Sequence, residues 1–478
     1  MMMMNRKLIT GFIVASLLAG CTVGPKYNRP AVKTPDVYRG TDASTPSGSN
    51  SLGDLKWFEV FKDDQLQGLI QTALVQNYDV RDAVARELEA RANLGITRSD
   101  QSPQIGGSAS LTSTQLSTEG SIILPKNQSG GFSITRTRNF GSILLNLASF
   151  EVDIWGRLRR ATEAARANLL ASDENRKAVM TTVVSDVAAA YFDLLELDME
   201  LDIERRTLAT RQHSLELIKT RNQGGVATML DVRQAEELVY TAAVAIPNTE
   251  LQIEQTENQI TLLLGQNPGT VIRGHRLVDQ EQPPPTPPGL PSSLIERRPD
   301  IRAAEQTLIA ANADIGVAKA AYFPEISLTG FLGTESSQLS NLFTGATRAW
   351  NFVPQISQPI FTGGRIKSNV KFSQAQKQEA LVQYEKAIQT GFTEVSNALI
   401  QQRRAREIRV QQELLVEAVR DRVRLAYMRY EGGVDTLLNA LDADRELFSD
   451  ELVLAQDRRN ELLAAVQLYR ALGGGWQQ

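Results

Sequence analysis

The sequence carries the same succession of short motifs twice, and this internal duplication restricts the possible folds more than any other feature. The motifs of the first copy, in chain order, are Asp79-Val80-Arg81, Gly95, Pro103-Gln104-Ile105, Gly156-Arg157 and Gly224-Gly225-Val226. Those of the second copy, in the same order, are Asp300-Ile301-Arg302, Gly316, Pro324-Glu325-Ile326, Gly364-Arg365 and Gly432-Gly433-Val434. Agreement at this many ordered points indicates two copies of one structural unit, so we expect the same elements in both.

The region after Arg157 has the pattern of a very long helix. Its apolar residues recur at heptad spacing and are Val183, Val187, Ala190, Leu194, Leu197, Leu201, Leu208, Leu215 and Ile218. Polar Glu204 and Arg211 interrupt this stripe. Such spacing predicts coiled-coil packing against neighbouring helices. About 65 residues separate Arg157 from the Gly224-Gly225 turn, which corresponds to about 100 Å of helix and is too long for a compact domain.

Each copy also contains stretches in which apolar and polar residues alternate. In the second copy, the apolar members are Ile326, Leu328, Gly330 and Leu332, and then Trp350, Phe352, Pro354 and Ile356. In the first copy they are Ile105, Gly107, Ala109 and Leu111, followed by a less regular return stretch. This alternation is typical of transmembrane β-strands. Four strands cannot close a barrel and lipid does not tolerate an open sheet edge, so we expect several subunits to pool their strands.

The N-terminus has the features of a bacterial lipoprotein signal. The polar, basic Asn5-Arg6-Lys7 precedes an apolar segment, Leu8 to Gly20, of signal-peptide length. The segment ends in Leu18-Ala19-Gly20-Cys21, which resembles a lipobox, so we expect Cys21 to carry a covalent N-acyl and diacylglycerol lipid. Cys21 is the only cysteine, which excludes disulfides and cysteine-based metal sites. Thr22 follows it instead of the aspartate of an inner-membrane retention signal, which favours outer-membrane sorting.

Composition argues against other classes of function. The net charge is −4 and no block of basic residues occurs, so we expect no nucleic-acid partner. The two histidines, His213 and His275, stand in no metal-ligand or catalytic-triad spacing, and no glycine-rich phosphate loop follows a strand. We therefore expect no enzymatic activity, no metal and no cofactor apart from the lipid on Cys21.

These observations predict a mainly α fold with a transmembrane β part. Its expected organisation, in chain order, is a signal peptide (1–20), a lipidated extended segment (21–57), a first repeat (58–281), a proline-rich linker (282–292) and a second repeat (293–478). The expected strands are about 103–115, 140–154, 324–333 and 349–361. The expected long helices cover 157–264 and 365–472.

The sequence resembles the TolC-like outer-membrane factors, in particular the lipoprotein branch that works with resistance–nodulation–division drug pumps. The residues that carry this resemblance are Cys21 to Tyr27, Arg297 to Glu305, Phe361 to Arg365, Tyr430 to Asp444 and Tyr469 to Trp476. The resemblance implies a homotrimer with a shared twelve-stranded β-barrel in the outer membrane and a long helical barrel in the periplasm. It also implies a periplasmic adaptor and an inner-membrane transporter as partners, with small toxic compounds leaving passively through the duct.

The glycine turns are the expected functional site. Gly224, Gly225 and Val226 in the first copy, and Gly432, Gly433 and Val434 in the second, reverse the helix pairs and are expected to contact the adaptor. The resemblance assigns the gate to Tyr430, Asp435 and Asp442; the two acids lie seven residues apart and would form carboxylate rings in a trimer. A purely structural turn, and an acid that favours a helix dipole, are the competing interpretations. Glu431 replaces an arginine common among relatives, so we expect no matching salt bridge at the tip.

Two other functions remain open at this stage. The same fold is compatible with a duct for protein secretion or for metal-ion efflux, because the substrate is chosen largely by the transporter. A coiled-coil lipoprotein that tethers without a pore explains the long helices, but the alternating stretch with Trp350 and Phe352 counts against it.

Overall fold

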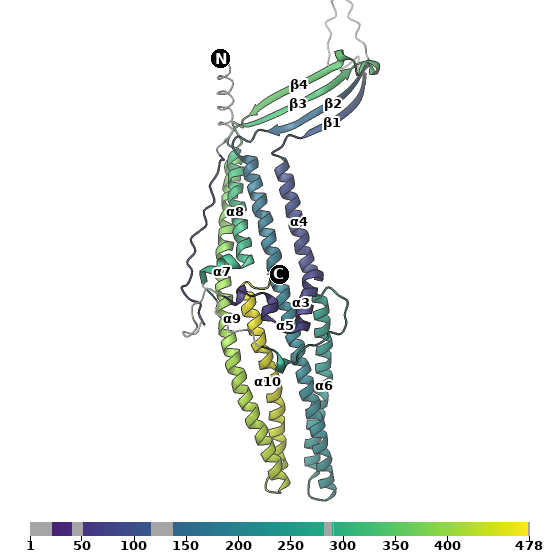
Figure 1. Ribbon diagram of the computed structural model, residues 1–478, viewed down its shortest axis with the longest axis vertical. Coiled ribbons are helices and arrows are strands. Elements are labelled where there is room, and N and C mark those ends of the chain that lie inside the picture. The colour runs from purple at the N-terminus through teal and green to yellow at the C-terminus, as the bar shows by residue number, and fades with distance from the viewer. Residues whose placement is uncertain (1–21, 41–50, 116–136, 282–288, 290, 477–478) are drawn as a thin grey trace, which may run out of the picture. The chain divides into compact units, whose positions relative to one another are not determined.

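The computed structural model describes residues 22–40, 51–115, 137–281, 289 and 291–476. The expected signal peptide, Cys21 and most of the proline-rich linker lie outside these residues. The described chain is mainly helical and has four strands, as predicted (Figure 1). It divides into two compact units. Unit 1 comprises the described part of Met1–Arg29 with Glu89–Leu169 and Gln306–Leu381, and unit 2 comprises Pro30–Leu88, Leu170–Glu305 and Val382–Gln478.

The three longest helices of each predicted copy have matching lengths. In chain order they are α2 (Trp57–Val60), α3 (Asp64–Gln76), α4 (Tyr78–Ser99), α5 (Arg157–Gln223), α6 (Met229–Leu263), α7 (Pro291–Arg297), α8 (Pro299–Ala320), α9 (Arg365–Glu431) and α10 (Leu437–Ala471). Short 3-10 turns are η1 (Leu52–Asp54), η2 (Leu277–Asp279), η3 (Leu339–Asn341) and η4 (Gly345–Thr347). Helices α5 and α9 each have 67 residues, α6 and α10 each have 35, and α4 and α8 each have 22.

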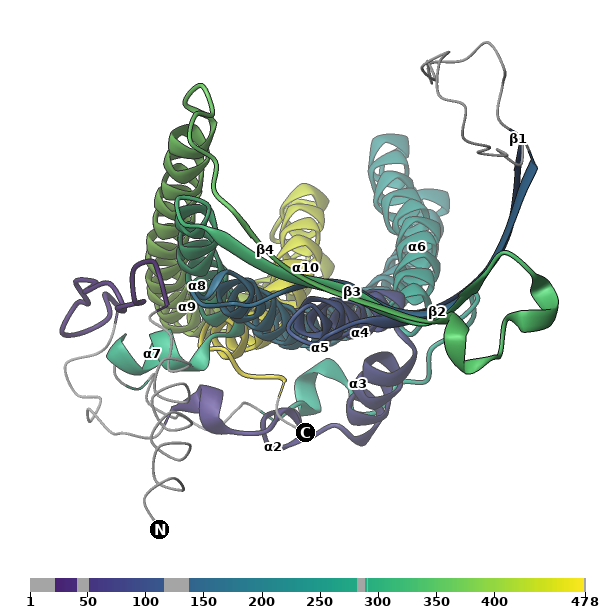
Figure 2. The same cartoon turned by 90° about the horizontal axis from the view of Figure 1, so that it is seen from above.

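The four strands of unit 1 form one antiparallel sheet in the order β1-β2-β3-β4. Their bounds are β1 (Ile105–Gln115), β2 (Thr137–Glu151), β3 (Glu325–Ser336) and β4 (Arg348–Ser357). Strands β2 and β3, which belong to different predicted copies, pair with each other with a register shift between Leu147 and Phe150. The sheet is strongly curved, as Figure 2 shows. Within the described chain, β1 and β4 are its edges.

The strand register gives the sheet one apolar face. Residues paired across the strands on this face include the row Gly107, Leu145, Leu332 and Trp350. Other members of the face are Ile105, Ala109, Leu111, Ile143, Leu147, Ile326, Leu328, Phe352 and Ile356. The opposite face is mostly polar, with Ser108, Ser110, Ser142, Asn146, Thr329, Asn351 and Gln355, but it also holds Leu144, Phe331 and Val353.

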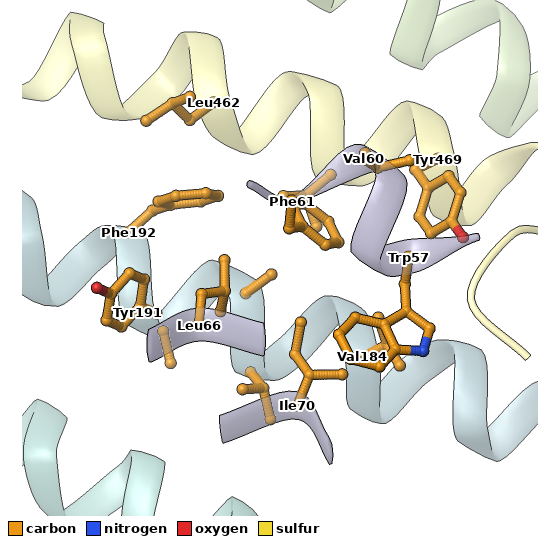
Figure 3. Close-up of a cluster of buried hydrophobic side chains, with 14 of the residues drawn as sticks. Trp57, Val60, Phe61, Leu66, Ile70, Val184, Tyr191, Phe192, Leu462 and Tyr469 are labelled. Atoms are coloured by element: carbon orange, nitrogen blue, oxygen red, sulfur yellow. The ribbon is translucent and has the colours of Figure 1, made fainter. Parts of the chain in front are cut away.

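The core of unit 2 lies where short N-terminal elements pack on α5 and α10 (Figure 3). Leu66 and Ile70 of α3 are fully buried there beside Tyr191 of α5, and Phe61 makes an edge-to-face contact with Tyr469 of α10. An 18-residue stretch of α5 is apolar enough to cross a membrane by composition, but 67% of it is buried in the fold, as in a core helix. The heptad stripe of α5 is therefore internal packing.

Asp63 ties this core together. Its carboxylate accepts hydrogen bonds from the amides of Gln65 and Leu66, which caps α3, and from the Tyr191 hydroxyl at 3.0 Å. The His275 amide and the Gln280 side chain also donate to it. Although burial raises the pKa of Asp63, these hydrogen bonds, led by that of Gln280, bring the pKa below its ordinary value.

Candidate functional site at the hairpin turns

The turn between α5 and α6 is closed by a glycine and a helix cap. Gly225 has φ +77°, and the Val226 amide donates to the Arg221 carbonyl at 2.9 Å. This is the usual way in which a helix C-terminus ends at a left-handed glycine. The Thr228 hydroxyl accepts from the Asp231 amide, and Asp231 in turn accepts from the Thr228 amide, so a capping box begins α6.

The turn between α9 and α10 has the same backbone but a different cap. Gly433 has φ +72°, and the Val434 amide donates to the Arg429 carbonyl at 3.0 Å. Thr436 precedes α10 without a side-chain cap. In both turns only the second glycine has a positive φ, so Gly224 and Gly432 are not required for the left-handed conformation.

Asp435 replaces the missing cap and pairs with an arginine. Its carboxylate accepts from the Thr436 amide at 2.8 Å, from the Asn439 side chain at 2.7 Å and from Arg429 Nε at 3.0 Å. Arg429, followed by the Thr436 and Asn439 hydrogen bonds, holds the pKa of Asp435 below its usual range. The salt bridge at this turn is therefore made by Arg429 of α9 and not by position 431, where Glu431 stands.

Asp442 is held in the same way one heptad further into α10. It pairs with Arg422 of α9 at 3.3 Å and with Arg445 of its own helix. The two pairs Arg429–Asp435 and Arg422–Asp442 thus form a ladder across the second hairpin. Both pairs are accessible to solvent, so water and ions screen them and each breaks at little cost.

Tyr430 joins the second hairpin to the first. The guanidinium of Arg221 on α5 lies 4.5 Å from the centre of the Tyr430 ring, at cation–π distance. Tyr430 also packs against a cluster of buried side chains from both hairpins, namely Leu215, Ile218, Val232, Ala235, Leu238, Val239, Leu437 and Leu441. The two turns therefore lie side by side at one end of unit 2 (Figure 1).

Arg211 links the two hairpins, a contact that was not predicted from the sequence. Arg211 interrupts the heptad stripe of α5 and is only 3% exposed, and its Nε donates to Asp444 of α10 at 2.7 Å. Nη1 of Arg211 donates to the Leu238 carbonyl of α6 at 3.0 Å, and the guanidinium lies 4.8 Å from the centre of the Phe448 ring. A charged residue at a core heptad position was the available signal, but its partner lies in the other copy.

The turns also present apolar side chains to solvent. Val226 is 71% exposed and Val434 is 69% exposed. His213 is on the surface of α5. Within the described ranges, no cluster of histidine, cysteine, aspartate or glutamate has the geometry to hold a metal ion.

A curved sheet with one apolar face, continued by 67-residue helices, defines an outer-membrane protein of the channel-forming type. The chain belongs to the outer membrane efflux protein family, whose model matches residues 69–266 and 290–474.

Individual relatives match nearly the whole chain. The probable efflux pump outer membrane protein TtgC of Pseudomonas putida is 36% identical, over 99% of this chain and 97% of the relative. The cation efflux system protein CusC of Escherichia coli is also 36% identical, over 98% of both chains. The crystal structure of the open state of the MtrE outer membrane channel of Neisseria gonorrhoeae has a TM-score of 0.83 and 32% identity, and the match covers 96% of this chain and 99% of that one.

Proposed function

We propose that this protein is the exit duct of a tripartite efflux system and conducts small toxic compounds passively through the outer membrane. In this proposal three copies assemble, an inner-membrane transporter supplies the energy, and a periplasmic adaptor joins the two. The protein itself performs no enzymatic reaction and carries no cofactor apart from a lipid on Cys21.

The apolar face of the sheet is the observation that carries the proposal. Across the row Gly107, Leu145, Leu332 and Trp350 every residue is apolar or glycine, whereas the adjacent row from Gly106 to Asn351 contains two asparagines, Asn146 and Asn351. A lipid-facing side and a water-facing side that alternate along each strand are what a transmembrane barrel requires. Both edges of the sheet need partners in lipid, and other copies of the chain supply them.

Three copies give twelve strands and six long hairpins. The alternation of strand direction supports this assembly, because β4 of one copy meets β1 of the next in antiparallel orientation. The equal lengths of α5 and α9, and of α6 and α10, support an internal duplication that makes the helical part nearly regular around the duct.

The proposed gate is the second hairpin, with Tyr430, Asp435 and Asp442. In a trimer the two acids form rings that favour cations at the narrowest point. Opening the gate breaks the solvent-accessible ion pairs with Arg429 and Arg422 and the contact of Tyr430 with Arg221. Val226 and Val434 are suited to contact an apolar surface of the adaptor because most of each side chain is exposed.

Drug-like compounds are the substrates that we propose first, and metal ions are the second candidate. The second candidate rests on CusC, named as a cation efflux protein, which is as similar to this chain as TtgC is. The two candidates are separated by expressing the protein with a drug transporter or with a metal-ion transporter in a strain that lacks its own duct. Restored resistance to organic toxicants supports the first candidate, and restored resistance to metal salts supports the second.

Adjacent residues of β4 provide a direct test of the membrane assignment. Phe352 lies on the apolar face and Asn351 on the opposite face. Phe352→Lys places a charge in lipid, at a cost of about 2–4 kcal/mol near the midplane, whereas Asn351→Lys places it in water. We expect Phe352→Lys to lower the yield of heat-resistant trimers in outer membranes and Asn351→Lys to leave it near wild type. Equal effects of the two substitutions would contradict the barrel.

A further inference from the structure

The segment that follows Cys21 is bound to unit 1 through its backbone. The Val23 amide donates to the Trp155 carbonyl at 3.0 Å, immediately after β2 and before α5. Trp155 is itself fixed, because its ring stacks on Phe323 at 4.7 Å and its Nε1 donates to the Pro324 carbonyl at 2.9 Å. The segment therefore attaches to the fold between β2 and α5, next to the residues that precede β3.

Two buried polar side chains hold the carbonyl groups of the same segment. Arg160 of α5 donates from Nε to the Val23 carbonyl at 3.3 Å, and Asn312 of α8 donates from Nδ2 to the Pro25 carbonyl at 3.0 Å. Arg160 is 6% exposed and Asn312 is fully buried. Buried polar groups of this kind are costly without a partner, so the segment and its binding groups depend on one another.

Glycines make the close approach possible. Gly24 has φ +112°, and a Cβ on it would lie 2.6 Å from Cα of Gly316 in α8. A Cβ on Gly316 would lie 2.8 Å from the Val23 carbonyl oxygen. Gly156, at φ +78°, would place a Cβ 2.8 Å from Cγ2 of Thr22. These separations are too short for real Cβ atoms, so the contact exists only because all three residues are glycine.

The glycines at the equivalent positions of the repeated motifs have no such contact. Gly95 of α4 corresponds to Gly316 in the repeated motif, yet a Cβ on Gly95 would meet no atom within 4 Å. The same is true of Gly364, which corresponds to Gly156. The contact therefore uses one glycine from each predicted copy, and neither equivalent position makes it.

We propose that Gly156, Arg160, Asn312 and Gly316 form an anchor cradle, which binds Thr22–Pro25 and fixes the lipid of Cys21 beside the end of β2. This inference rests on the proposed acylation of Cys21. A single residue, Thr22, separates Cys21 from the first hydrogen bond, so the lipid attaches within about 7 Å of that point. A lipid fixed there holds the sheet at one depth in the membrane, and it raises the local concentration of subunits that insert together.

Matched glycine substitutions test the anchor cradle. Gly316→Ala and Gly95→Ala each replace a helical glycine, which favours the helix by about 1 kcal/mol, but only Gly316→Ala collides with the segment. Hydrogen exchange of the Val23 amide in the purified lipoprotein reports the contact. We expect protection in wild type and in Gly95→Ala, and exchange faster by about tenfold or more in Gly316→Ala and in Asn312→Ala. Wild-type protection in both of these last variants overturns the cradle.

The role in positioning the lipid is tested by assembly in cells. We expect Gly316→Ala to slow the appearance of heat-resistant trimers in the outer membrane, and Gly95→Ala to leave it unchanged. If Gly316→Ala loses protection at Val23 but assembles at the wild-type rate, the positioning role is overturned. Mass spectrometry of Cys21 and the conductance of assembled trimers are measured on the same samples. Absent acylation or absent conductance would refute the proposed function, and neither result alters the exchange comparison at Val23.

Discussion

The hairpin of α5 and α6 and the hairpin of α9 and α10 have helices of equal length and turns with the same left-handed glycine, but different contacts hold them. The first turn is closed by the capping box of Thr228 and Asp231. The second is closed by Asp435, which is shared between the start of α10 and Arg429. The second hairpin thus depends on exposed ion pairs that a binding partner can exchange for its own contacts.

This difference supports the proposal that the gate lies in the second hairpin. Exposed ion pairs contribute little stability, so their loss does not unfold the helices. In the first hairpin the turn is held by the hydrogen bonds of Thr228 and Asp231 with each other. Further from the turn, Arg211 of α5 binds Asp444 of α10. We infer that the turn of the second hairpin, with Asp435, moves while the salt bridge between Arg211 and Asp444 remains intact.

The largest expected effect comes from this buried pair. Arg211→Met leaves Asp444 buried without its partner, which destabilises the protein by about 3–5 kcal/mol. The double variant Arg211→Met, Asp444→Leu removes both charges and should recover most of the loss. Chemical denaturation of the purified protein measures both, and equal stability of the single and double variants would show that the pair is not coupled.

Helices α6 and α10 have equal lengths, but only α6 contains a proline, so substitutions at this position test whether the two helices have the same backbone requirements. Pro247 lies inside α6, and the equivalent residue of α10 is Ala455, which is fully buried. Ala455→Pro removes a helical hydrogen bond and should cost about 3 kcal/mol or more, whereas Pro247→Ala should stabilise α6. Amide exchange along α6 and α10 is the measurement. A neutral Ala455→Pro would mean that α10 is already interrupted there.

The two caps should differ by a smaller amount. Thr228→Ala removes a side-chain cap and should cost about 1 kcal/mol, whereas Thr436→Ala removes none and should stay within about 0.5 kcal/mol. Thermal denaturation of the two variants under one condition measures the difference. Equal losses would contradict the distinction between the turns.

The smallest effect depends on pH. Burial, and then the neighbouring Glu200, raise the pKa of Glu196 in α5 to about 8, while the equivalent residue of α9 is the exposed Arg404. The pKa of Glu196 is higher in the folded state than in the unfolded state. Its contribution to the free energy of unfolding is therefore fully present below about pH 4.5 and is lost as the pH rises through about 8, because the buried carboxyl group must then ionise. Glu196→Gln should therefore raise the melting temperature by about 2–4 °C at pH 8.5 and leave it unchanged at pH 4. Arg404→Gln is the control and should change neither value.

The sequence predicted the repeating parts of the fold well because their periods are local. Alternation marked β1, β3 and β4, and heptad spacing marked α5. Strand β2 begins earlier than expected, at Thr137, and its register shift near Phe150 explains the poor alternation of this stretch.

The missed contacts all join residues that are far apart in the chain. Arg211 and Asp444 are buried together although they lie 233 residues apart in the chain, and Gly24 meets Gly316 only in the folded unit. At the second turn the sequence pointed to position 431, whereas the cation comes from Arg429 two residues earlier. Helix phase decides that choice, because only a side chain on the correct face of α9 reaches Asp435.

Conductance in planar bilayers tests the central claim of a gated duct most directly. The comparison is between wild type, the double variant Asp435→Ser, Asp442→Ser, and Asp231→Ser, which removes the acid of the first turn. We predict small or flickering conductance in wild type and in Asp231→Ser, and larger, less cation-selective conductance in the double variant. Equal conductance in all three would contradict the gate, and no conductance from verified trimers would contradict the duct itself.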